Sequence, residues 1–335
     1  MSPVHVRDSS MQPGYVLATR NHSHRAVMEA EAHVTVSWTD VGANDMLLAY
    51  PSGAYTAMRT FGHRGIMDFS GHVARLASSV AQIHFSESEQ DRSKEDVAVE
   101  TRLTTFRNPE TLYTEMKELV RSALMVYYGR YTESGEAKVT VLCTWDVNIS
   151  EPIFIAHIEP LKVPKEPRCK VLVQGSPRHH ATAKDSQWVR DRSILEAELS
   201  KDMNEALLLD DATQELYEGL SSNFFAWDRI RQTIITAPLD SVLEGTILKV
   251  VVAVCKQQKI PVEFKFPTLK SINDWDGAFI TSTSRLVLPI KTMVLPDGSQ
   301  KSFGESETIE LIRTLVLQEC KKRVETLLTA QEIDE

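Results

Sequence analysis

A proline-rich stretch near the middle of the chain constrains the fold more than any other feature. The segment EPLKVPKEPRC, residues 159–169, holds three prolines and charges of both signs. Proline disrupts helices and sheets, so such a stretch is typical of a linker. The chain has 335 residues, a length that suggests two domains. The sequence therefore predicts an N-terminal extension (1–24), a small N-terminal domain (25–160), a linker (161–168) and a large C-terminal domain (169–335).

Each predicted domain mixes strand patterns with helix patterns. In the first half, apolar runs predict strands at 32–38, 45–50, 54–62, 136–145 and 153–161. Helices are predicted after the N-cap Ser70 and from Pro109 to a stop at Gly129, with a solvated polar loop over 86–98. In the second half, strands are predicted at 169–175, 205–211, 223–228, 233–238, 261–267 and 277–284, and helices at 191–203, 245–258 and 305–328. Both halves therefore belong to the α+β class.

Composition and charge argue against several functional classes. The net charge of −9 disfavours a general nucleic-acid partner. No apolar run approaches the length of a membrane span, and the N-terminus lacks the apolar core of a secretory signal. We expect a cytoplasmic protein, and the Ser- and Arg-containing N-terminus leaves an organelle transit peptide open.

The cysteines and histidines predict neither a metal site nor a disulfide framework. The four cysteines are at positions 143, 169, 255 and 320. No Cys-x-x-Cys occurs, which argues against a clustered zinc site and against a disulfide scaffold. His179 and His180 have no acidic or thiol partner at metal spacing, so we interpret them as part of a polar loop.

Glu218 is the charged residue whose position most needs an explanation. It lies in YEGLSSNFF, between the strand pattern EALLLDD and the apolar run FFAWD. A buried carboxylate is costly unless a partner compensates its charge. The sequence thus raises the question of what Glu218 pairs with.

Two basic residues are candidates for chemistry. Lys184 follows the small residues Ala181-Thr182-Ala183, and a lysine that points from there into a cavity would be partly desolvated and nucleophilic. The alternative is an exposed loop lysine. Arg75, on the helix predicted after Ser70, is either a surface cation or a phosphate clamp.

Two further segments could bind an anion. Gly245 opens an apolar helix, where backbone N–H groups and the helix dipole favour a phosphate, although Glu244 precedes it. The segment FITSTSR ends a strand in hydroxyl residues that include Thr283. A simple helix entry and a Ser/Thr turn are the structural alternatives.

Taken in chain order, these motifs resemble the class IV, or fold type IV, pyridoxal-phosphate (PLP) enzymes. The likeness runs from about Gly53 to Pro289 through GAYTAMRTFG, HVARL, ATAKDSQW and EALLLDDATQELYEGLSSNFFAW. The family includes branched-chain and D-amino acid aminotransferases and aminodeoxychorismate lyases. A closer likeness is to a plant-type aminotransferase-like branch with a similar Trp-Val-Arg after the lysine. The resemblance implies a smaller N-terminal α/β domain and a larger C-terminal β-barrel-like domain with flanking helices.

The resemblance also implies the roles of individual residues. Lys184 would hold PLP as a Schiff base and move the proton between carbon positions. Glu218 would face the pyridine nitrogen, which answers the question of its partner. The remaining cofactor-binding set implied by the family is Arg75, Ser222, Asn223, Thr246, Ile247 and Thr283. Tyr55 and Trp188 are candidates for the walls of the substrate pocket, with ordinary core packing as the alternative. A homodimer is implied as well.

Departures from the family pattern keep the activity open. Gly245-Thr246-Ile247-Leu248 stands where the family usually has Gly-Ile-Thr-Arg, and Trp188 stands near a common tyrosine position. The favoured interpretation is a transaminase acting on an amino acid and a 2-oxo acid. A PLP-dependent 4-amino-4-deoxychorismate lyase and a catalytically silent binding protein are the alternatives.

Overall fold

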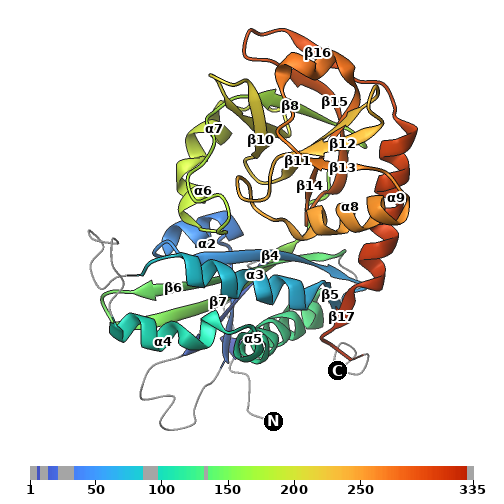
Figure 1. Ribbon diagram of the computed structural model, residues 1–335. Coiled ribbons are helices and arrows are strands. Elements are labelled where there is room, and N and C mark those ends of the chain that lie inside the picture. Colours follow the sequence, from blue (N-terminus) through green and yellow to red (C-terminus); the bar gives the residue numbers. More distant parts are fainter. Residues whose placement is uncertain (1–5, 8–13, 22–33, 86–96, 132–134, 330–335) are drawn as a thin grey trace. The chain divides into compact units, whose positions relative to one another are not determined.

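The protein, here a computed structural model, divides into two compact units that are each discontinuous in sequence. The structure describes residues 6–7, 14–21, 34–85, 97–131 and 135–329. Unit 1 comprises Met1–Lys162, Ala183–Arg190 and Val324–Glu335, and unit 2 comprises Val163–Thr182 and Asp191–Arg323 (Figure 1). The first division falls within the segment predicted as the linker, 161–168. Two short segments that follow unit 2 residues in the chain return to unit 1.

Unit 1 is built on one mixed sheet. Its strand order is β1-β3-β2-β7-β6-β4-β5-β17. The strands are β1 (Val6–Arg7), β2 (Tyr15–Asn21), β3 (Val34–Thr39), β4 (Ala54–Phe61), β5 (Gly65–Met67), β6 (Ala137–Asp146), β7 (Glu151–Pro160) and β17 (Val324–Thr326). Strand β2 pairs with both β3 and β7, so part of the segment predicted as an N-terminal extension is a strand inside the sheet.

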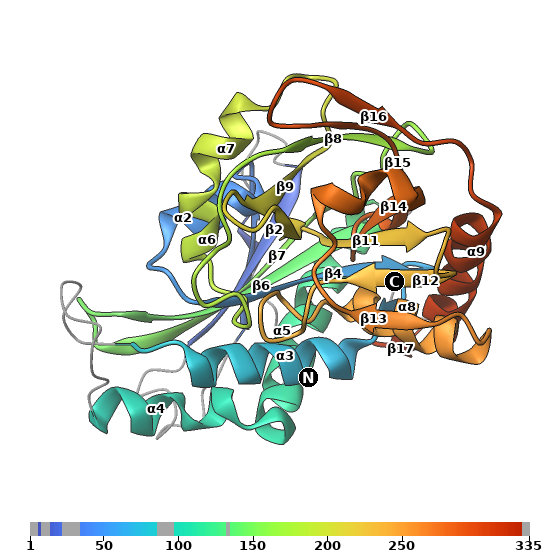
Figure 2. The same ribbon diagram turned by 45° about the horizontal axis from the view of Figure 1, so that its top comes forward.

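Four of the described helices flank this sheet. They are α2 (Ala43–Ala49), α3 (Phe69–Gln82), α4 (Val97–Arg107) and α5 (Pro109–Arg130). Helix α5 begins as the sequence predicts, because the side chain of Asn108 accepts a hydrogen bond from the Glu110 N–H and Pro109 needs no partner for a missing N–H. Figures 1 and 2 show α3 and α5 on one face of the sheet.

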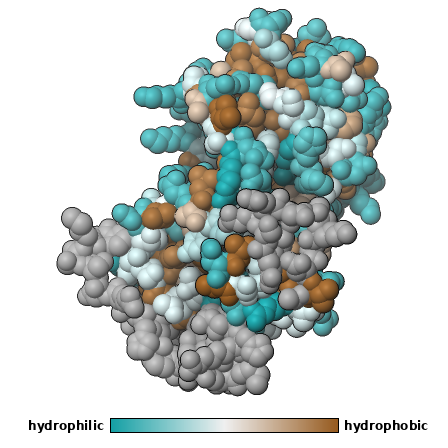
Figure 3. All heavy atoms as spheres, turned by 90° about the vertical axis from the view of Figure 1, so that its left-hand side faces the viewer, coloured by the Kyte–Doolittle hydropathy of each residue, from teal (hydrophilic) through white to brown (hydrophobic). Residues whose placement is uncertain are grey.

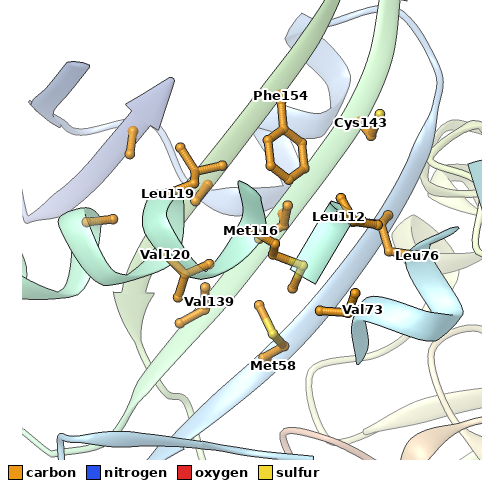
Figure 4. Close-up of a cluster of buried hydrophobic side chains, with 14 of the residues drawn as sticks. Met58, Val73, Leu76, Leu112, Met116, Leu119, Val120, Val139, Cys143 and Phe154 are labelled. Atoms are coloured by element: carbon orange, nitrogen blue, oxygen red, sulfur yellow. The ribbon is translucent and has the colours of Figure 1, made fainter. Parts of the chain in front are cut away.

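The main core of unit 1 lies between that face and the two long helices. Figure 4 shows Met58 of β4 and Phe154 of β7 beside side chains of both helices, among them Leu76 of α3 and Met116 of α5. All four side chains are buried. The opposite face of the sheet packs against α2 in a smaller cluster, which contains Leu47. Successive residues of β4 therefore face different clusters, as the two-residue period of a strand requires.

Helix α3 is capped by a residue that is distant in sequence. The carboxylate of Glu325, on β17, accepts hydrogen bonds from the Ser70 N–H at 2.7 Å and from the Ser70 hydroxyl at 2.9 Å. A carboxylate at this end of a helix binds a free N–H and complements the helix dipole. The prediction of Ser70 as the N-cap is wrong by two residues, because the helix begins at Phe69 and Asp68 takes the cap position.

Unit 2 contains a ring of strands. The order β10-β9-β8-β15-β14-β11-β12-β13 and the extra pairing of β10 with β11 close six of them into a barrel. The strands are β8 (Cys169–Val173), β9 (Glu205–Asp210), β10 (Glu215–Gly219), β11 (Asn223–Asp228), β12 (Thr233–Thr236), β13 (Val262–Phe264), β14 (Trp275–Ser282), β15 (Leu286–Val294) and β16 (Gln300–Ser302). This confirms the α+β class and the barrel-like second domain.

The helices of the second half are α6 (Gln187–Asp191), α7 (Ser193–Glu198), α8 (Thr246–Gln257), the 3-10 turn η1 (Leu269–Asp274) and α9 (Glu307–Lys322). Helices α8 and α9 pack against each other and against β14 (Figure 2). The predicted helix over 191–203 is shorter and lies in two pieces, and the one over 305–328 ends at Lys322, because β17 follows.

Two further elements differ from the sequence prediction. Residues 45–50, predicted as a strand, lie mostly in α2, because a short apolar run fits one face of a helix as well as a buried strand. Residues 86–96 of the predicted loop lie outside the described part, and α4 begins at Val97.

The surface of unit 2 in the upper part of Figure 3 mixes hydrophilic and hydrophobic side chains. None of the described helices is both long enough and apolar enough to span a bilayer. All four cysteines lie in the described part, are buried, and form no disulfide with one another.

Candidate active site

The segment that carries Lys184 runs along the start of β4 like a short added strand. The Tyr55 N–H donates to the Lys184 carbonyl at 2.9 Å, and the Ser186 N–H donates to the Gly53 carbonyl at 2.8 Å. The Gly53 N–H in turn donates to the Ser186 hydroxyl at 3.0 Å. A Cβ on Gly53 would lie 2.4 Å from the carbonyl oxygen of Cys143, so this close approach needs glycine.

Lys184 is also held from the side of helix α3. Its backbone N–H donates to the hydroxyl of Ser79 at 3.0 Å, and Ser79 is buried. The Lys184 Nζ lies 4.4 Å from the centre of the Tyr55 ring, a distance typical of a cation–π contact. Lys184 is half-buried, so its exposure lies between the two alternatives that the sequence left open.

Arg75 lies in a polar cluster on the same helix. Its Nη2 donates to the Thr56 hydroxyl at 2.8 Å and lies 3.2 Å from His72 Nδ1. Thr56 Oγ1 and His72 Nδ1 are 2.8 Å apart. Since guanidinium only donates, His72 Nδ1 accepts and the ring proton is on Nε2.

The ionisation of His72 is strongly perturbed. The ring is fully buried. Burial lowers the pKa of His72 well below its usual range, and the positive charges of Arg75 and Lys184 lower this pKa further. His72 is therefore a neutral acceptor for Arg75 at physiological pH. The amine of Lys184 lies close enough to act on the ring electrostatically.

In unit 2, the buried carboxylate of Glu218 pairs with Arg178. Its Oε1 accepts from Arg178 Nε at 2.7 Å, and both side chains are less than a tenth exposed. Its Oε2 accepts from the Leu243 N–H at 3.1 Å. The sequence analysis did not predict a role for Arg178, which directly precedes His179 and His180. A buried glutamate that requires a cation was the signal that could have found it.

The turn after Glu218 is held by a second buried carboxylate. Glu205 Oε2 accepts from the hydroxyls of Ser221 at 2.9 Å and Ser222 at 3.0 Å, and from Arg285 Nη1 at 2.7 Å. A Cβ on Gly219 would lie 2.4 Å from Ser222 Oγ, so the turn packs closely against this network. The hydroxyl of Ser222, predicted to bind the cofactor, thus bonds to Glu205.

Asn223 fixes the loop that leads to α8. Its Nδ2 donates to the Leu243 carbonyl at 2.7 Å. A Cβ on Gly245 would lie only 2.2 Å from Asn223 Oδ1. Glu218 and Asn223 therefore hold the same loop from β10 and β11, and Gly245 is required by the contact with Asn223.

The N-terminus of α8 has the donors of an anion site. Gly245 is the N-cap and no side chain caps the first turn, which contains Thr246 and Ile247. Thr246 is buried, and its hydroxyl lies 3.4 Å from the hydroxyl of Thr283. First-turn N–H groups together with hydroxyls suit a phosphate, so these residues fit a phosphorylated cofactor.

The carboxylate of Glu244, which directly precedes this helix start, has a partner. Its Oε2 lies 2.9 Å from Lys249 Nζ. Both side chains are about half exposed. The ion pair compensates the negative charge next to the helix start.

The two aromatic candidates lie in different surroundings. Tyr55 is buried in the cluster against α2, and its ring faces Lys184. Trp188 lies in α6, is half-buried, and its backbone N–H donates to the Asp185 carbonyl at 3.2 Å. Among the described residues, no group of three or more His, Cys, Asp or Glu side chains is arranged to hold a metal ion.

Comparison with known proteins places the chain in a family. Residues 53–293 match the model of the family described as amino-transferase class IV. No curated protein matches the sequence significantly.

Solved structures share the fold at low sequence identity. A branched-chain aminotransferase of Thermoproteus uzoniensis, with norvaline, is 18% identical with a TM-score of 0.63, over 86% of this chain and 94% of that one. A fold IV transaminase of Curtobacterium pusillum is 14% identical with a TM-score of 0.66, over 92% and 99%. A putative branched-chain amino acid aminotransferase of Thermotoga maritima is 19% identical with a TM-score of 0.55, over 79% and 86%.

Proposed function

This chain belongs to the amino-transferase class IV family, and we propose that it moves an amino group between an amino acid and a 2-oxo acid with pyridoxal phosphate bonded to Lys184. When bound, the cofactor supplies an aldehyde that reacts with amines and a ring that withdraws electrons from the substrate carbon. The chain must bind it, orient it and move a proton.

The anchoring of Lys184 carries this proposal. Its carbonyl and N–H are bonded to Tyr55 and Ser79, so the backbone is fixed while the amine extends over the Tyr55 ring. A lysine used only for solubility needs no such positioning. We propose that Lys184 Nζ would hold the cofactor through its aldehyde carbon, with loss of water, and that the amine, once displaced by the substrate amine, would carry the proton between carbon positions.

We propose that Glu218 accepts a hydrogen bond from the ring nitrogen. Arg178 Nε and the Leu243 N–H hold the carboxylate of Glu218, and Arg178 stabilises its ionised form. A carboxylate at the ring nitrogen keeps the ring protonated and so strengthens its electron withdrawal.

The phosphate ligands in this proposal are Arg75, the Thr246 and Ile247 N–H groups and the Thr283 hydroxyl. Each is a donor, as a phosphate requires. Ser222 and Asn223 contribute by holding their neighbours, because their side chains bond to Glu205 and to the Leu243 carbonyl.

The substrate and the assembly are further parts of the proposal. Tyr55 and Trp188 would line the pocket for the amino-acid side chain, and a branched-chain or other apolar side chain agrees with the names of the structural relatives. A homodimer and a cytoplasmic location complete the proposal.

Borohydride reduction in the presence of PLP tests the attachment. The pyridoxyl label should map to the peptide that contains Lys184, and Lys184→Ala should abolish it. Lys170→Ala, which removes an exposed lysine paired with Asp202, is the matched control and should leave the label unchanged. Labelling of another lysine, or none with PLP in excess, would contradict the proposal.

A half-reaction separates the transaminase from the lyase. Stoichiometric amino acid without any oxo acid should remove the absorbance of the bound aldehyde, and 2-oxoglutarate or pyruvate should restore it. No change across a broad amino-acid panel, together with pyruvate release from 4-amino-4-deoxychorismate, would favour the lyase. Failure of both would favour a silent binding protein.

A further inference from the structure

One face of helix α3 carries three polar residues that contact the candidate site. His72, Arg75 and Ser79 are spaced three and four residues apart, so their side chains follow one face of the helix. His72 and Ser79 are fully or almost fully buried, and Arg75 is half-buried. Buried polar side chains on a helix face are retained only where they find partners.

Ser79 has its partner in the lysine segment. Its hydroxyl accepts from the Lys184 N–H at 3.0 Å, across 105 residues of sequence. Because the bond is to the backbone of Lys184, it fixes the origin of the side chain without engaging the amine. Ser79 therefore limits the positions that Lys184 Nζ can adopt.

Thr56 and His72 act on Arg75 instead. The Thr56 hydroxyl and His72 Nδ1 both accept hydrogen bonds from Arg75 Nη2, at 2.8 and 3.2 Å. Both acceptors are neutral, so they direct the guanidinium without cancelling its positive charge themselves. Their short mutual contact of 2.8 Å makes them one rigid unit.

Since Arg75 and Ser79 are four residues apart, their backbone positions are separated by about one helical turn, roughly 6 Å along the axis. In pyridoxal phosphate the aldehyde and the phosphate are carried by neighbouring ring carbons. A rigid helix that positions one residue for each group would set the separation that both bonds need.

We propose that α3, together with Thr56 of β4, has two independent positioning functions. Ser79 places Lys184 for the aldehyde, and His72 with Thr56 places Arg75 for the phosphate. This rests on the proposed function. Neither Ser79 nor Thr56 needs to touch the cofactor. Each acts through one other residue, so each should affect one end of the cofactor alone.

Two probes test whether the two positioning functions are independent. One probe carries only the aldehyde of the cofactor, and the other carries only the phosphate. Pyridoxal has the aldehyde without the phosphate, and borohydride trapping at Lys184 measures the rate of its bonding. 4-Deoxypyridoxine phosphate has the phosphate without the aldehyde, and its dissociation constant measures the phosphate site. Both readouts are independent of turnover.

Each of two variants should change the readout of one probe and leave the readout of the other unchanged. Ser79→Ala should slow pyridoxal trapping about tenfold and leave the dissociation constant of 4-deoxypyridoxine phosphate within about twofold. Thr56→Val, which has the same shape as threonine, should raise that dissociation constant about tenfold and leave trapping within about twofold. Thr56→Ser, which keeps the hydroxyl, should restore phosphate binding.

Equal effects of both variants on both probes, or no effect on either, would overturn the separation. If Ser79→Ala does not fold, Ser79→Cys retains the size with a weaker acceptor and should give the same selective loss. A parent protein that is not labelled at Lys184 by pyridoxal or by PLP would instead overturn the proposed function itself. The two failures are therefore distinguishable.

Discussion

The polar groups around the candidate residues of unit 1 differ in kind from those around the candidate residues of unit 2. In unit 1, Arg75 donates to Thr56 and to a neutral His72. In unit 2, the turn after Glu218 is held by an ion pair in which Glu205 is buried and Arg285 is mostly buried. A neutral acceptor directs a cation without cancelling its charge. A buried ion pair fixes geometry and ionisation together, and removing one partner leaves an uncompensated charge.

The largest expected effect is therefore on the stability of unit 2. Glu205→Ala removes the acceptor of Arg285, Ser221 and Ser222 and should lower the free energy of unfolding by about 3 kcal/mol. Urea-induced unfolding measures this loss. Glu244→Ala breaks an exposed pair with Lys249 and should change the unfolding free energy by no more than about 0.5 kcal/mol. Equal losses in the two variants would show that burial does not distinguish the pairs.

Glu218→Gln should test the catalytic side of the same unit. The variant should lose turnover by about 3 kcal/mol, more than a hundredfold, because the group that stabilises developing charge is gone. Its unfolding free energy should fall as well, because the buried Arg178 loses its charged partner. Steady-state kinetics with saturating cofactor measure the loss. Glu215→Gln, on the same strand, is the control and should keep its turnover. Unchanged turnover in Glu218→Gln would make Glu218 a structural residue.

In unit 1, Arg75→Ala should act on binding more than on rate. Loss of a phosphate clamp should weaken PLP binding by about 2 kcal/mol, roughly thirtyfold, with a smaller fall in turnover at saturating PLP. Fluorescence titration gives the dissociation constant. Pyridoxal, which lacks the phosphate, should bind the variant and the parent alike. If the variant holds PLP as tightly as the parent, the phosphate site lies elsewhere.

The smallest expected effect is a pH dependence of stability due to His72. Its pKa is lowered in the folded protein, so near and below the ordinary value of about 6.5 the unfolded state binds more protons than the folded state. Stability should therefore fall as the pH decreases from 7 to 5, by at most about 1.4 kcal/mol per pH unit from this group.

Unfolding at a series of pH values measures that slope. His72→Asn should reduce the slope, and the exposed His179→Gln should not. The pKa of His157 is also lowered, mainly by burial. His157 therefore adds to the fall of stability with decreasing pH, and both variants retain this contribution. A slope unchanged in His72→Asn would contradict the assignment of a neutral, buried histidine.

The sequence predicted the elements of the candidate site better than their contacts. The chain order of Arg75, Lys184, Glu218 and Gly245 indicated the family, and the family match confirms it. The strand patterns of β4, β6, β7 and β11 were found because alternating or buried apolar runs are local signals. Assignments of individual cofactor-binding residues stay predictions.

What the sequence could not predict depends on residues far apart in the chain. Ser79 bonds to Lys184 across 105 residues, and Arg178 bonds to Glu218 across 40. A serine on a helix and an arginine in a loop have no local pattern that reports such partners. Helix α2 was missed for a different reason, because its apolar run is too short to distinguish the period of a helix from that of a strand.

The Glu325 cap on α3 has a consequence for the order of events during synthesis. N-terminal regions of a growing chain generally fold first. The helix that carries Arg75 and Ser79 emerges early, yet the carboxylate bonded to Ser70 belongs to residue 325. On the ribosome, α3 therefore lacks this partner until residue 325 has been translated, and ribosome-bound chains that stop before Val324 should show faster amide hydrogen exchange at Ser70 than released chains.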